Sequence, residues 1–264
     1  TTRGGATSHV AILARSLGIP ALAGVDPAVL EVPDGTVVIL DANDGTLRLH
    51  ASSADVAVTR RAQERLELRR RENAARALEP AITVDGRRIE VLANIGGLED
   101  ATRIAALGGE GVGLLRSEFL FLGRRDAPTE EEQFETYKAI AEALGPGRPL
   151  IIRTLDVGGD KPLAYLPIPK EGNPFLGERG VRVGLDRPEI LRTQLRAILR
   201  AAAFGKVSVM FPMIATLNEL RDVKAMLGEE AASLGVPPVA AGIMVEVPAT
   251  AIMAAQFARE ADFF

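Results

Sequence analysis

A histidine near the start of the chain stands in a glycine-rich setting. His9 lies in the run GGATSHVAILAR, where two glycines and two hydroxyl-bearing residues precede it. A neutral imidazole has a reference pKa of about 6.5 and carries one nucleophilic lone pair. Glycines let the backbone approach a phosphate closely, and amide groups at a helix start bind anions. We therefore predict that His9 attacks a phosphorus atom, although a lone histidine more often packs or caps a helix end.

Four cationic residues elsewhere could hold a small anion. They are Arg116 in GLLRSEF, Arg153 in IIRTLD, Lys161 in GGDK and Arg179 in NPFLGERGVR. A planar guanidinium binds phosphate or carboxylate through two parallel hydrogen bonds, so several together could hold a dianion or trianion. Each of the four follows a predicted strand or sits among glycine and proline.

Five further arginines are expected to include several solvated helix positions. These are Arg182, Arg187, Arg192, Arg196 and Arg200.

Glu246 is a candidate metal ligand. It lies in GIMVEVPA, where it is predicted to end a strongly apolar strand. A carboxylate is costly there unless it is paired or bound to metal. A hard cation such as Mg²⁺ suits its oxygens and could bridge them to substrate oxygens. A salt bridge to a neighbouring arginine is the alternative, and the residues alone leave both open.

Composition limits the class of protein. The chain has 264 residues, 47% of them apolar, and a formal charge of -4, which argues against a uniformly basic surface for nucleic acid. It has no cysteine, hence no disulfide or thiolate metal site. No run of about 18 apolar residues and no signal peptide is evident. We expect a soluble, cytoplasmic protein with no membrane insertion.

The first third of the chain predicts a small α/β unit and a connecting helix. Residues 7–18 read as a short capped helix with His9 in its first turn. Short β-like runs over 36–40 and 46–50 flank a turn. Residues 53–78 are dense in arginine, glutamate and alanine, which is typical of a solvated helix.

The remainder alternates between strand and helix patterns. Repeated β/α units predict a parallel sheet covered by helices. Charged residues at successive strand ends favour a (β/α)8 barrel over a doubly wound sheet, because the active sites of barrels lie at that rim. The predicted strands are 89–94, 111–115, 150–155, 207–213 and 241–245, and a sixth strand is predicted to begin near residue 261. The predicted helices are 98–107, 130–144, 188–203, 217–234 and 249–258.

Several segments together resemble Enzyme I of the bacterial phosphotransferase system, the phosphoenolpyruvate-protein phosphotransferase. The resemblance covers essentially the whole chain and is highly specific. The segments, in family order, are GGATSHVAILARSLGIPALAG, GVGLLRSEFLF, PTEEEQF, DVGGDK, NPFLGERGVR, LRAILRAAAFGK, MFPMI and IMVEVPA.

The resemblance implies an α/β organisation in three parts. Residues 1–52 would be the C-terminal part of a swivelling phosphohistidine domain and residues 53–80 a helical linker. Residues 81–264 would be a phosphoenolpyruvate-binding (β/α)8 TIM barrel, truncated at about the sixth strand. Since a second Mg²⁺ ligand, a further arginine and a catalytic cysteine of the family would follow Phe264, this segment alone is predicted to be inactive.

The same resemblance implies the chemistry. His9 would carry the phosphoryl group, while the four cationic residues would bind phosphate and carboxylate. Glu246 would be one of two Mg²⁺ ligands. The phosphohistidine would pass its group to the phosphocarrier protein HPr, the first step of sugar uptake, and the protein would form a homodimer through the barrel.

Four alternatives remain open from the sequence. A pyruvate phosphate dikinase or phosphoenolpyruvate synthase shares the TSH motif and the barrel but passes phosphate to a nucleotide. A non-catalytic protein could bind phosphoenolpyruvate without labelling His9, and a metal-dependent aldolase or lyase would have no use for the histidine domain. A nitrogen-regulatory paralogue or a fusion with HPr modules would have the same core.

Overall fold

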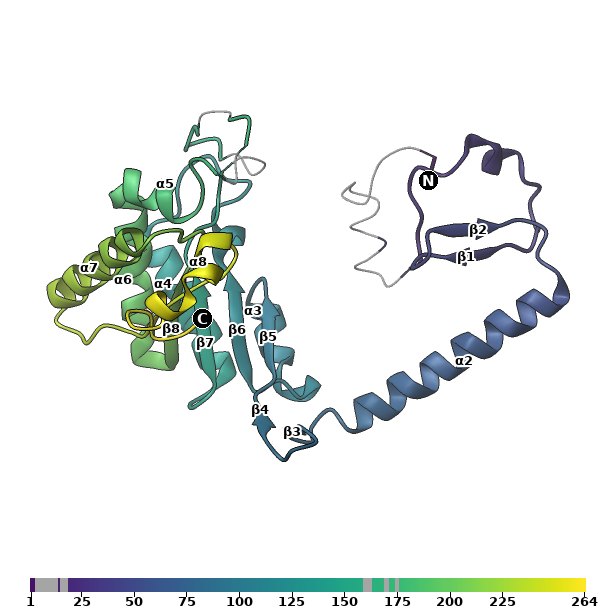
Figure 1. The fold of residues 1–264 in the computed structure, drawn as a ribbon, viewed down its shortest axis with the longest axis horizontal. Helices are drawn as coiled ribbons and strands as arrows, with labels where there is room; N and C mark the ends of the chain where they lie inside the picture. Colours follow the sequence, from purple (N-terminus) through teal and green to yellow (C-terminus); the bar gives the residue numbers. More distant parts are fainter. Residues whose placement is uncertain (3–13, 15–18, 159–162, 169–170, 174–175) are drawn as a thin grey trace. The chain divides into compact units, whose positions relative to one another are not determined.

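The computed structural model describes residues 1–2, 14, 19–158, 163–168, 171–173 and 176–264. The chain divides into two compact units, Thr1–Arg76 and Ala77–Phe264. In the first, β1 (Ile39–Asp41) pairs antiparallel with β2 (Thr46–Arg48) after a 3₁₀ helix at Pro27–Glu31 (Figure 1). The two predicted strands are therefore present with shifted limits. The predicted helix around His9 lies outside the described residues.

The helix α2 (Ser53–Ala75) closes the first unit. Its N-terminus is a capping box, in which the Ser52 hydroxyl accepts from the Asp55 amide and the Asp55 carboxylate accepts from the Ser52 amide. None of its residues is buried, so the capping box, rather than packing in a core, supports it. The predicted solvated helix is confirmed, ending three residues earlier than expected.

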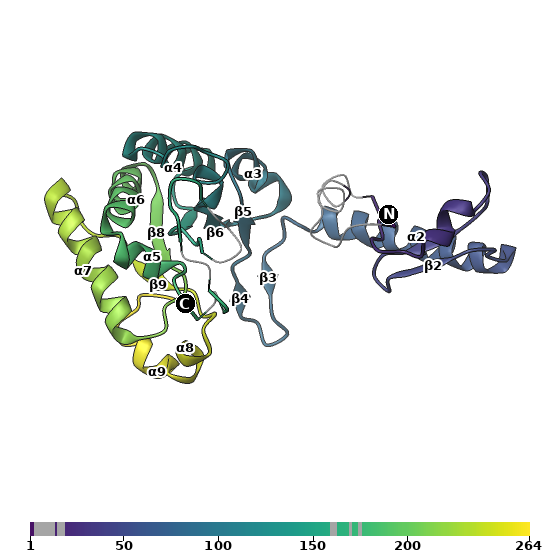
Figure 2. The same ribbon diagram turned by 90° about the horizontal axis from the view of Figure 1, so that it is seen from above.

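The second unit is built on one parallel sheet. Its strands are β5 (Leu92–Ile95), β6 (Gly111–Arg116), β7 (Pro149–Arg153), β8 (Lys206–Phe211) and β9 (Ala241–Ile243). Each strand pairs with the next one in the chain, in the order β5-β6-β7-β8-β9 (Figures 1 and 2). The mixed α/β architecture with a parallel sheet is confirmed. Because all five strands point the same way, their carboxyl ends share one rim.

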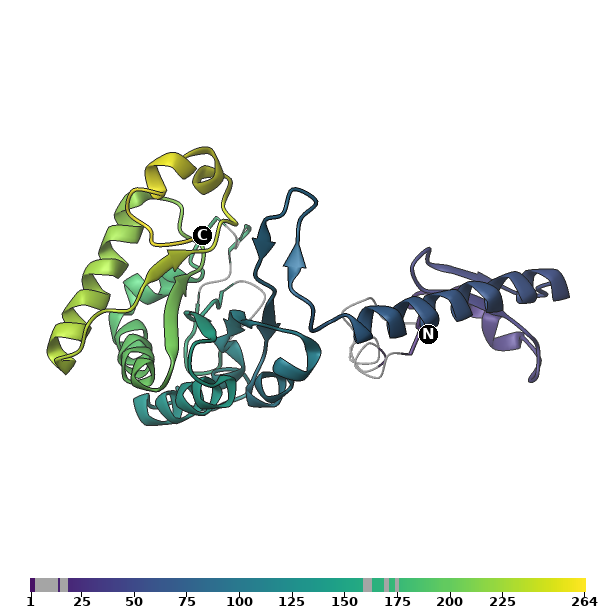
Figure 3. The ribbon, with the colours of Figure 1, turned by 90° about the horizontal axis from the view of Figure 1, so that it is seen from below.

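Helices in chain order cover the outer face of this sheet (Figures 2 and 3). The covering helices are α3 (Leu98–Arg103), α4 (Glu130–Leu144), α6 (Pro188–Ala201) and α7 (Leu217–Leu234). The limits of α4 and α7 agree with those predicted. Both begin at a threonine capping box and end at a glycine with positive φ, Gly145 and Gly235.

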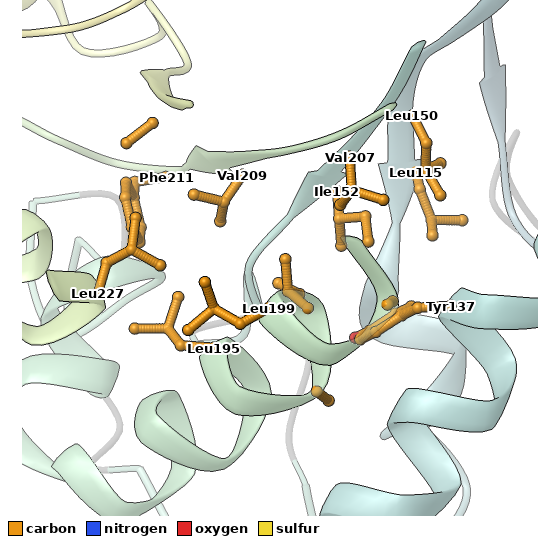
Figure 4. Packing of buried hydrophobic residues seen from close by; sticks show 14 of the residues in the cluster. Leu115, Tyr137, Leu150, Ile152, Leu195, Leu199, Val207, Val209, Phe211 and Leu227 are labelled. Atoms are coloured by element: carbon orange, nitrogen blue, oxygen red, sulfur yellow. The ribbon is translucent and has the colours of Figure 1, made fainter. Parts of the chain in front are cut away.

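The core lies between the sheet and this helix layer (Figure 4). Leu115 and Ile152 from the strands belong to one cluster with Leu195 from α6, and all three are completely buried. Burying each such side chain contributes about 1.5–3 kcal/mol. The side chain of Tyr137 from α4 lies in the same cluster with its hydroxyl inside the protein.

A hairpin precedes the sheet where the sequence predicts one strand over 89–94. Strand β3 (Ala81–Ile82) pairs antiparallel with β4 (Arg88–Ile89), and Gly86 adopts φ +85° in the turn. The chain then enters β5 only at Leu92. The carboxylate of Glu110 holds the junction, because it pairs with Arg88 and accepts from the Val91 amide at 2.9 Å.

The C-terminal elements also differ from the prediction. The single helix expected over 249–258 is two short ones, α8 (Pro248–Ile252) and α9 (Ala254–Phe257), because Met253 between them has non-helical dihedrals. No sixth strand is formed in the described C-terminal residues. The Asp262 amide nevertheless donates to the Ala241 carbonyl at 3.0 Å, which keeps the last residues beside β9.

Candidate functional site

Two of the predicted anion-binding arginines end neighbouring strands. Arg116 is the last residue of β6 and Arg153 the last residue of β7, and the two are register partners in the sheet. A 3₁₀ helix, Ser117–Leu120, follows Arg116 directly and buries the side chain of Glu118. The parallel sheet therefore brings basic and acidic side chains from two strands to one place at the rim.

Buried ion pairs connect three segments of this rim. Arg153 donates to the Glu118 carboxylate, and its other terminal nitrogen lies 3.6 Å from the Asp156 carboxylate. Arg179 donates to Asp156 twice, from Nε at 3.0 Å and from Nη2 at 3.2 Å. All four side chains are less than 10% exposed. Burial of charge is tolerated here because each guanidinium faces a carboxylate.

Arg153 retains an unused donor. Its Nε is buried and has no hydrogen-bond partner among the described residues, while Nη1 makes a weak contact of 3.5 Å to the Met244 sulfur besides its ion pair with Asp156. A buried donor without a partner costs about 1–3 kcal/mol and suits a site that awaits an acceptor. Arg153 is therefore the best placed of the predicted residues to receive an anion.

Arg116 and Arg179 stand in different environments. Arg116 is exposed and makes no ion pair within the part of the chain that the structure describes. Arg179, by contrast, is held rigidly by Asp156. The structure thus joins Arg153 and Arg179 through one carboxylate, whereas Arg116 reaches the rim as a solvated cation. His9 and Lys161 lie outside the described residues.

Glu246 is placed differently from the prediction. Strand β9 ends at Ile243, so Glu246 lies in the following loop, where it is exposed rather than buried in an apolar strand. The alternative of an arginine salt bridge is also wrong within the described residues. The Glu246 Oε1 instead accepts from the Met213 amide at 2.8 Å. This contact fixes the carboxylate at the same rim, beyond the end of β8.

Met213 has an unusual backbone for this contact. Its φ of 61° lies in the left-handed region, which costs about 1 kcal/mol or more for a residue with a side chain. The neighbouring Ile214 carbonyl accepts from the buried Thr250 hydroxyl at 2.6 Å. Sequence patterns show no signal for such a strained residue at the end of a strand.

Two acidic residues at the site were given no role from the sequence. In the sequence, Glu118 and Asp156 are recognisable only as charged residues near strand ends. Their partners, Arg153 and Arg179, are 35 and 23 residues away along the chain. Among the described residues no group of three or more metal-ligating side chains occurs. Within those residues, too, no helix has the length and apolar character needed to cross a membrane.

The five further arginines, among which several solvated helix positions were expected, all form ion pairs. Arg182 donates to Glu219 at 3.2 Å, and Arg187 pairs with Glu178. The remaining three lie on α6 and bridge to acidic residues of α4 and α7. Their side chains stay partly exposed, but helical spacing could not reveal these acidic partners on other elements.

Comparisons with known proteins identify the family of the chain. A family model for the PEP-binding domain of PEP-utilising enzymes matches residues 70–264, and one for the mobile domain of PEP-utilising enzymes matches residues 1–45. The resemblance to Enzyme I is confirmed. The chain is 48% identical to the phosphoenolpyruvate-protein phosphotransferase of Geobacillus stearothermophilus and 45% identical to that of Bacillus subtilis.

These relatives are longer than the chain. The matches cover all of the chain but 46% and 47% of those two proteins, so the chain spans about half their length. It is also 48% identical to the multiphosphoryl transfer protein of Rhodobacter capsulatus and spans 32% of it. Similar identity to both kinds of protein leaves open which architecture surrounds this core.

Proposed function

Because the chain belongs to the family of PEP-utilising enzymes, we propose that its protein transfers the phosphoryl group of phosphoenolpyruvate to His9 and then to the phosphocarrier protein HPr. The observation that carries the proposal is the pair of buried arginines, Arg153 at the carboxyl end of β7 and Arg179 in the loop that follows, both fixed by carboxylates. Phosphoenolpyruvate is a small anion with one carboxylate and one phosphate, which two or more guanidinium groups match.

The side chains at the rim would act mainly by positioning and by charge. Carboxylates hold Arg153 and Arg179 in place before the substrate arrives, so little reorganisation is needed at the moment of transfer. Arg116 is solvated and can turn toward a bound anion, and Lys161 is proposed as a further cation. The P–O bond of phosphoenolpyruvate would break as His9 forms a P–N bond, and the enolate would take up a proton.

A magnesium ion is part of this proposal. The donor chemistry of Glu246 fits it, since the exposed carboxylate uses one oxygen for the Met213 amide and its second oxygen has no partner among the described residues. When bound, Mg²⁺ would neutralise charge on substrate oxygens. Mg²⁺ is commonly coordinated by one or two protein carboxylates together with waters and phosphate oxygens, so a single carboxylate ligand fits its usual coordination.

We propose the domain organisation predicted from the sequence: residues 1–52 in the phosphohistidine domain, 53–80 as linker and 81–264 in the barrel. Strand order equal to chain order supports a (β/α)8 barrel, because a doubly wound sheet reverses direction part-way. A cytoplasmic location and a homodimer formed through the barrel rest on the resemblance to Enzyme I.

The test uses the full-length protein with labelled phosphoenolpyruvate and Mg²⁺, with and without His9→Ala. We expect acid-labile label that requires His9 and passes to HPr. Label that passes only to a nucleotide would favour the dikinase. Binding without label would favour a non-catalytic sensor, and the absence of both would contradict phosphotransfer.

A further inference from the structure

Gln194 is a polar side chain buried completely within the core of the second unit. It lies on α6 and has no exposed surface. Its amide nitrogen donates to the Ser117 hydroxyl at 3.0 Å and to the Tyr137 hydroxyl at 3.0 Å. Its carbonyl oxygen accepts from the Leu155 amide at 2.9 Å. Three of its four possible hydrogen bonds are therefore made inside the protein.

Two of these three partners belong to the rim. Ser117 stands between Arg116 and Glu118 in the chain. Leu155 immediately precedes Asp156, two residues after the end of β7. From the core, Gln194 thus connects the segment that follows β6 to the segment that follows β7.

The same two segments carry the buried ion pairs of the site. Glu118 and Arg153 meet across them, and Asp156 passes the connection on to Arg179. A shift of either segment would alter the direction of both guanidinium groups. A misplacement of about 1 Å is enough to change an active site's performance strongly.

Stability alone does not explain a glutamine here. A buried amide contributes little net free energy over an apolar side chain of similar shape, whereas its partners lose much when it is removed. The rest of the inward face of α6, including Leu191, Leu195 and Ile198, is apolar. The amide supplies directional bonds that apolar packing cannot supply.

We propose that Gln194 is a positioning residue, which sets the spacing between the two rim segments and so aims Arg153 and Arg179 at the bound anion. The inference rests on the proposed function, because the anion is taken to be phosphoenolpyruvate. Gln194 does not touch the site itself and acts through Ser117 and the Leu155 amide.

Two hydroxyl deletions provide a matched test. Ser117→Ala removes the bond of the Gln194 amide on the rim side, and Tyr137→Phe removes its bond on the α4 side. Phosphoenolpyruvate binding is measured by calorimetry with Mg²⁺ in the full-length protein, in a His9→Ala background that prevents transfer. We expect Ser117→Ala to weaken binding by roughly threefold or more and Tyr137→Phe to change it less than about twofold.

Gln194→Met extends the test to the whole linkage. Methionine is close in size and shape, so this change removes the hydrogen bonds with little change in packed volume. We expect phosphoenolpyruvate binding to weaken by about tenfold. The matched control is Gln133→Met, a buried glutamine on α4 that contacts Tyr137 and the Pro128 carbonyl but no rim segment. Thermal unfolding midpoints should fall by similar amounts in the two variants.

The outcomes separate the inference from the proposed function. If Ser117→Ala and Tyr137→Phe weaken binding equally, or Gln194→Met behaves as Gln133→Met does, the positioning role is wrong. A double variant with Ser117→Ala and Gln194→Met should lose less than the product of the single losses, because both act through one bond. A His9→Ala protein that binds no phosphoenolpyruvate would overturn the proposed function and this inference with it.

Discussion

At the scale of single residues, Asp156 decides the charge balance of the site. Its buried carboxylate faces Arg179 through two hydrogen bonds and lies near Arg153. We expect Asp156→Asn to lower the free energy of unfolding by about 3 kcal/mol, because it leaves buried guanidinium charge uncompensated. Urea denaturation measures the loss.

A control variant and a rescue by phosphate test the role of this charge. Asp126→Asn changes an exposed aspartate and should have little effect on unfolding. Inorganic phosphate should restore part of the stability lost in Asp156→Asn, because an anion bound only by the folded state stabilises that state. Equal unfolding free energies for Asp156→Asn and the wild type would contradict the importance of this carboxylate.

Tyr137 predicts a dependence of stability on alkaline pH. Burial raises the pKa of its hydroxyl far above the ordinary value of 10.0, although hydrogen bonds from Gln194 and Ser117 act in the opposite direction. The folded state thus keeps the proton after the unfolded state has lost it. The stabilising contribution is complete below about pH 10 and is lost as pH rises further, by about 1.4 kcal/mol per pH unit.

Urea denaturation between about pH 9 and pH 11 measures this slope. Tyr137→Phe should make the free energy of unfolding fall less steeply with pH. Tyr165→Phe changes a tyrosine that is only partly buried, so most of the fall should remain. The chain has two tyrosines, so absorbance titration of the two variants assigns each ionisation. A decline unchanged in Tyr137→Phe would show that another group titrates.

The residues of the site could be predicted only in part from the sequence. The types and strand-end positions of Arg116 and Arg153 were enough to place both at the rim. The pairing of Arg153 with Glu118, or of Arg179 with Asp156, could not be predicted, because no helix or strand period relates those positions. Such contacts depend on the register of neighbouring strands, which local sequence does not determine.

At the scale of elements, α6 is bound to both neighbouring helices by a ladder of ion pairs. Arg196 and Arg200 each donate to Glu130 of α4 at 2.8 Å, and Arg196 also reaches Glu230 of α7 at 3.3 Å. The Arg200 guanidinium lies 3.9 Å from the centre of the Phe134 ring as well. Helices α4, α6 and α7 are therefore joined outside the core by charge as well as inside it by apolar contact.

Glu130 provides the test of this ladder. Partial burial raises the pKa of Glu130, but hydrogen bonds from Arg196 and Arg200 outweigh it and keep the pKa below the ordinary 4.5. Its stabilising contribution is therefore present above about pH 4.5 and is lost as pH falls through the lowered pKa. We expect Glu130→Gln to lower the free energy of unfolding by about 1 kcal/mol at neutral pH.

The difference between Glu130→Gln and the wild type should shrink in acid, as measured by urea denaturation at successive pH values. Glu135→Gln is a suitable control, since that glutamate of the same helix pairs only with Lys138 at 3.6 Å in the part described. If Glu135→Gln lowered the free energy of unfolding as much as Glu130→Gln does, the effect would come from the loss of any negative charge on α4 and not from the ion pairs of Glu130.

Helix limits were predicted most accurately where local chemistry marks them. Thr129 with Glu132, and Thr216 with Glu219, form capping boxes, and these signals depend on neighbouring residues alone. The hairpin of β3 and β4 was missed although Asp85-Gly86 is a turn signal. Two-residue strands have too short a pattern to be recognised, and the break at Met253 has no local breaker residue.

At the scale of the whole molecule, we expect the two units to differ in their resistance to local unfolding. The arginines at positions 60 to 71 on α2 are all exposed, and no residue of that helix is buried. Elements with few buried contacts open most easily. We expect limited trypsin digestion of the full-length protein to cut first within α2 and to leave residues from Ala77 onward as a resistant product.

Mass spectrometry of early time points identifies the first cuts. The arginines of α6 provide an internal control, because Arg192, Arg196 and Arg200 are held in ion pairs on a packed helix. Early cleavage at those three positions would show that the second unit is not the more stable one.

The sequential strand order has a consequence for how the protein is made. Each strand from β6 to β9 pairs with the strand synthesised just before it. A growing chain on the ribosome can therefore dock every new strand onto an edge that already exists, without waiting for a distant partner. Such stepwise addition keeps loop closures short and limits the time for which an apolar strand is exposed. In the second unit, the direction of translation and the direction of assembly are the same.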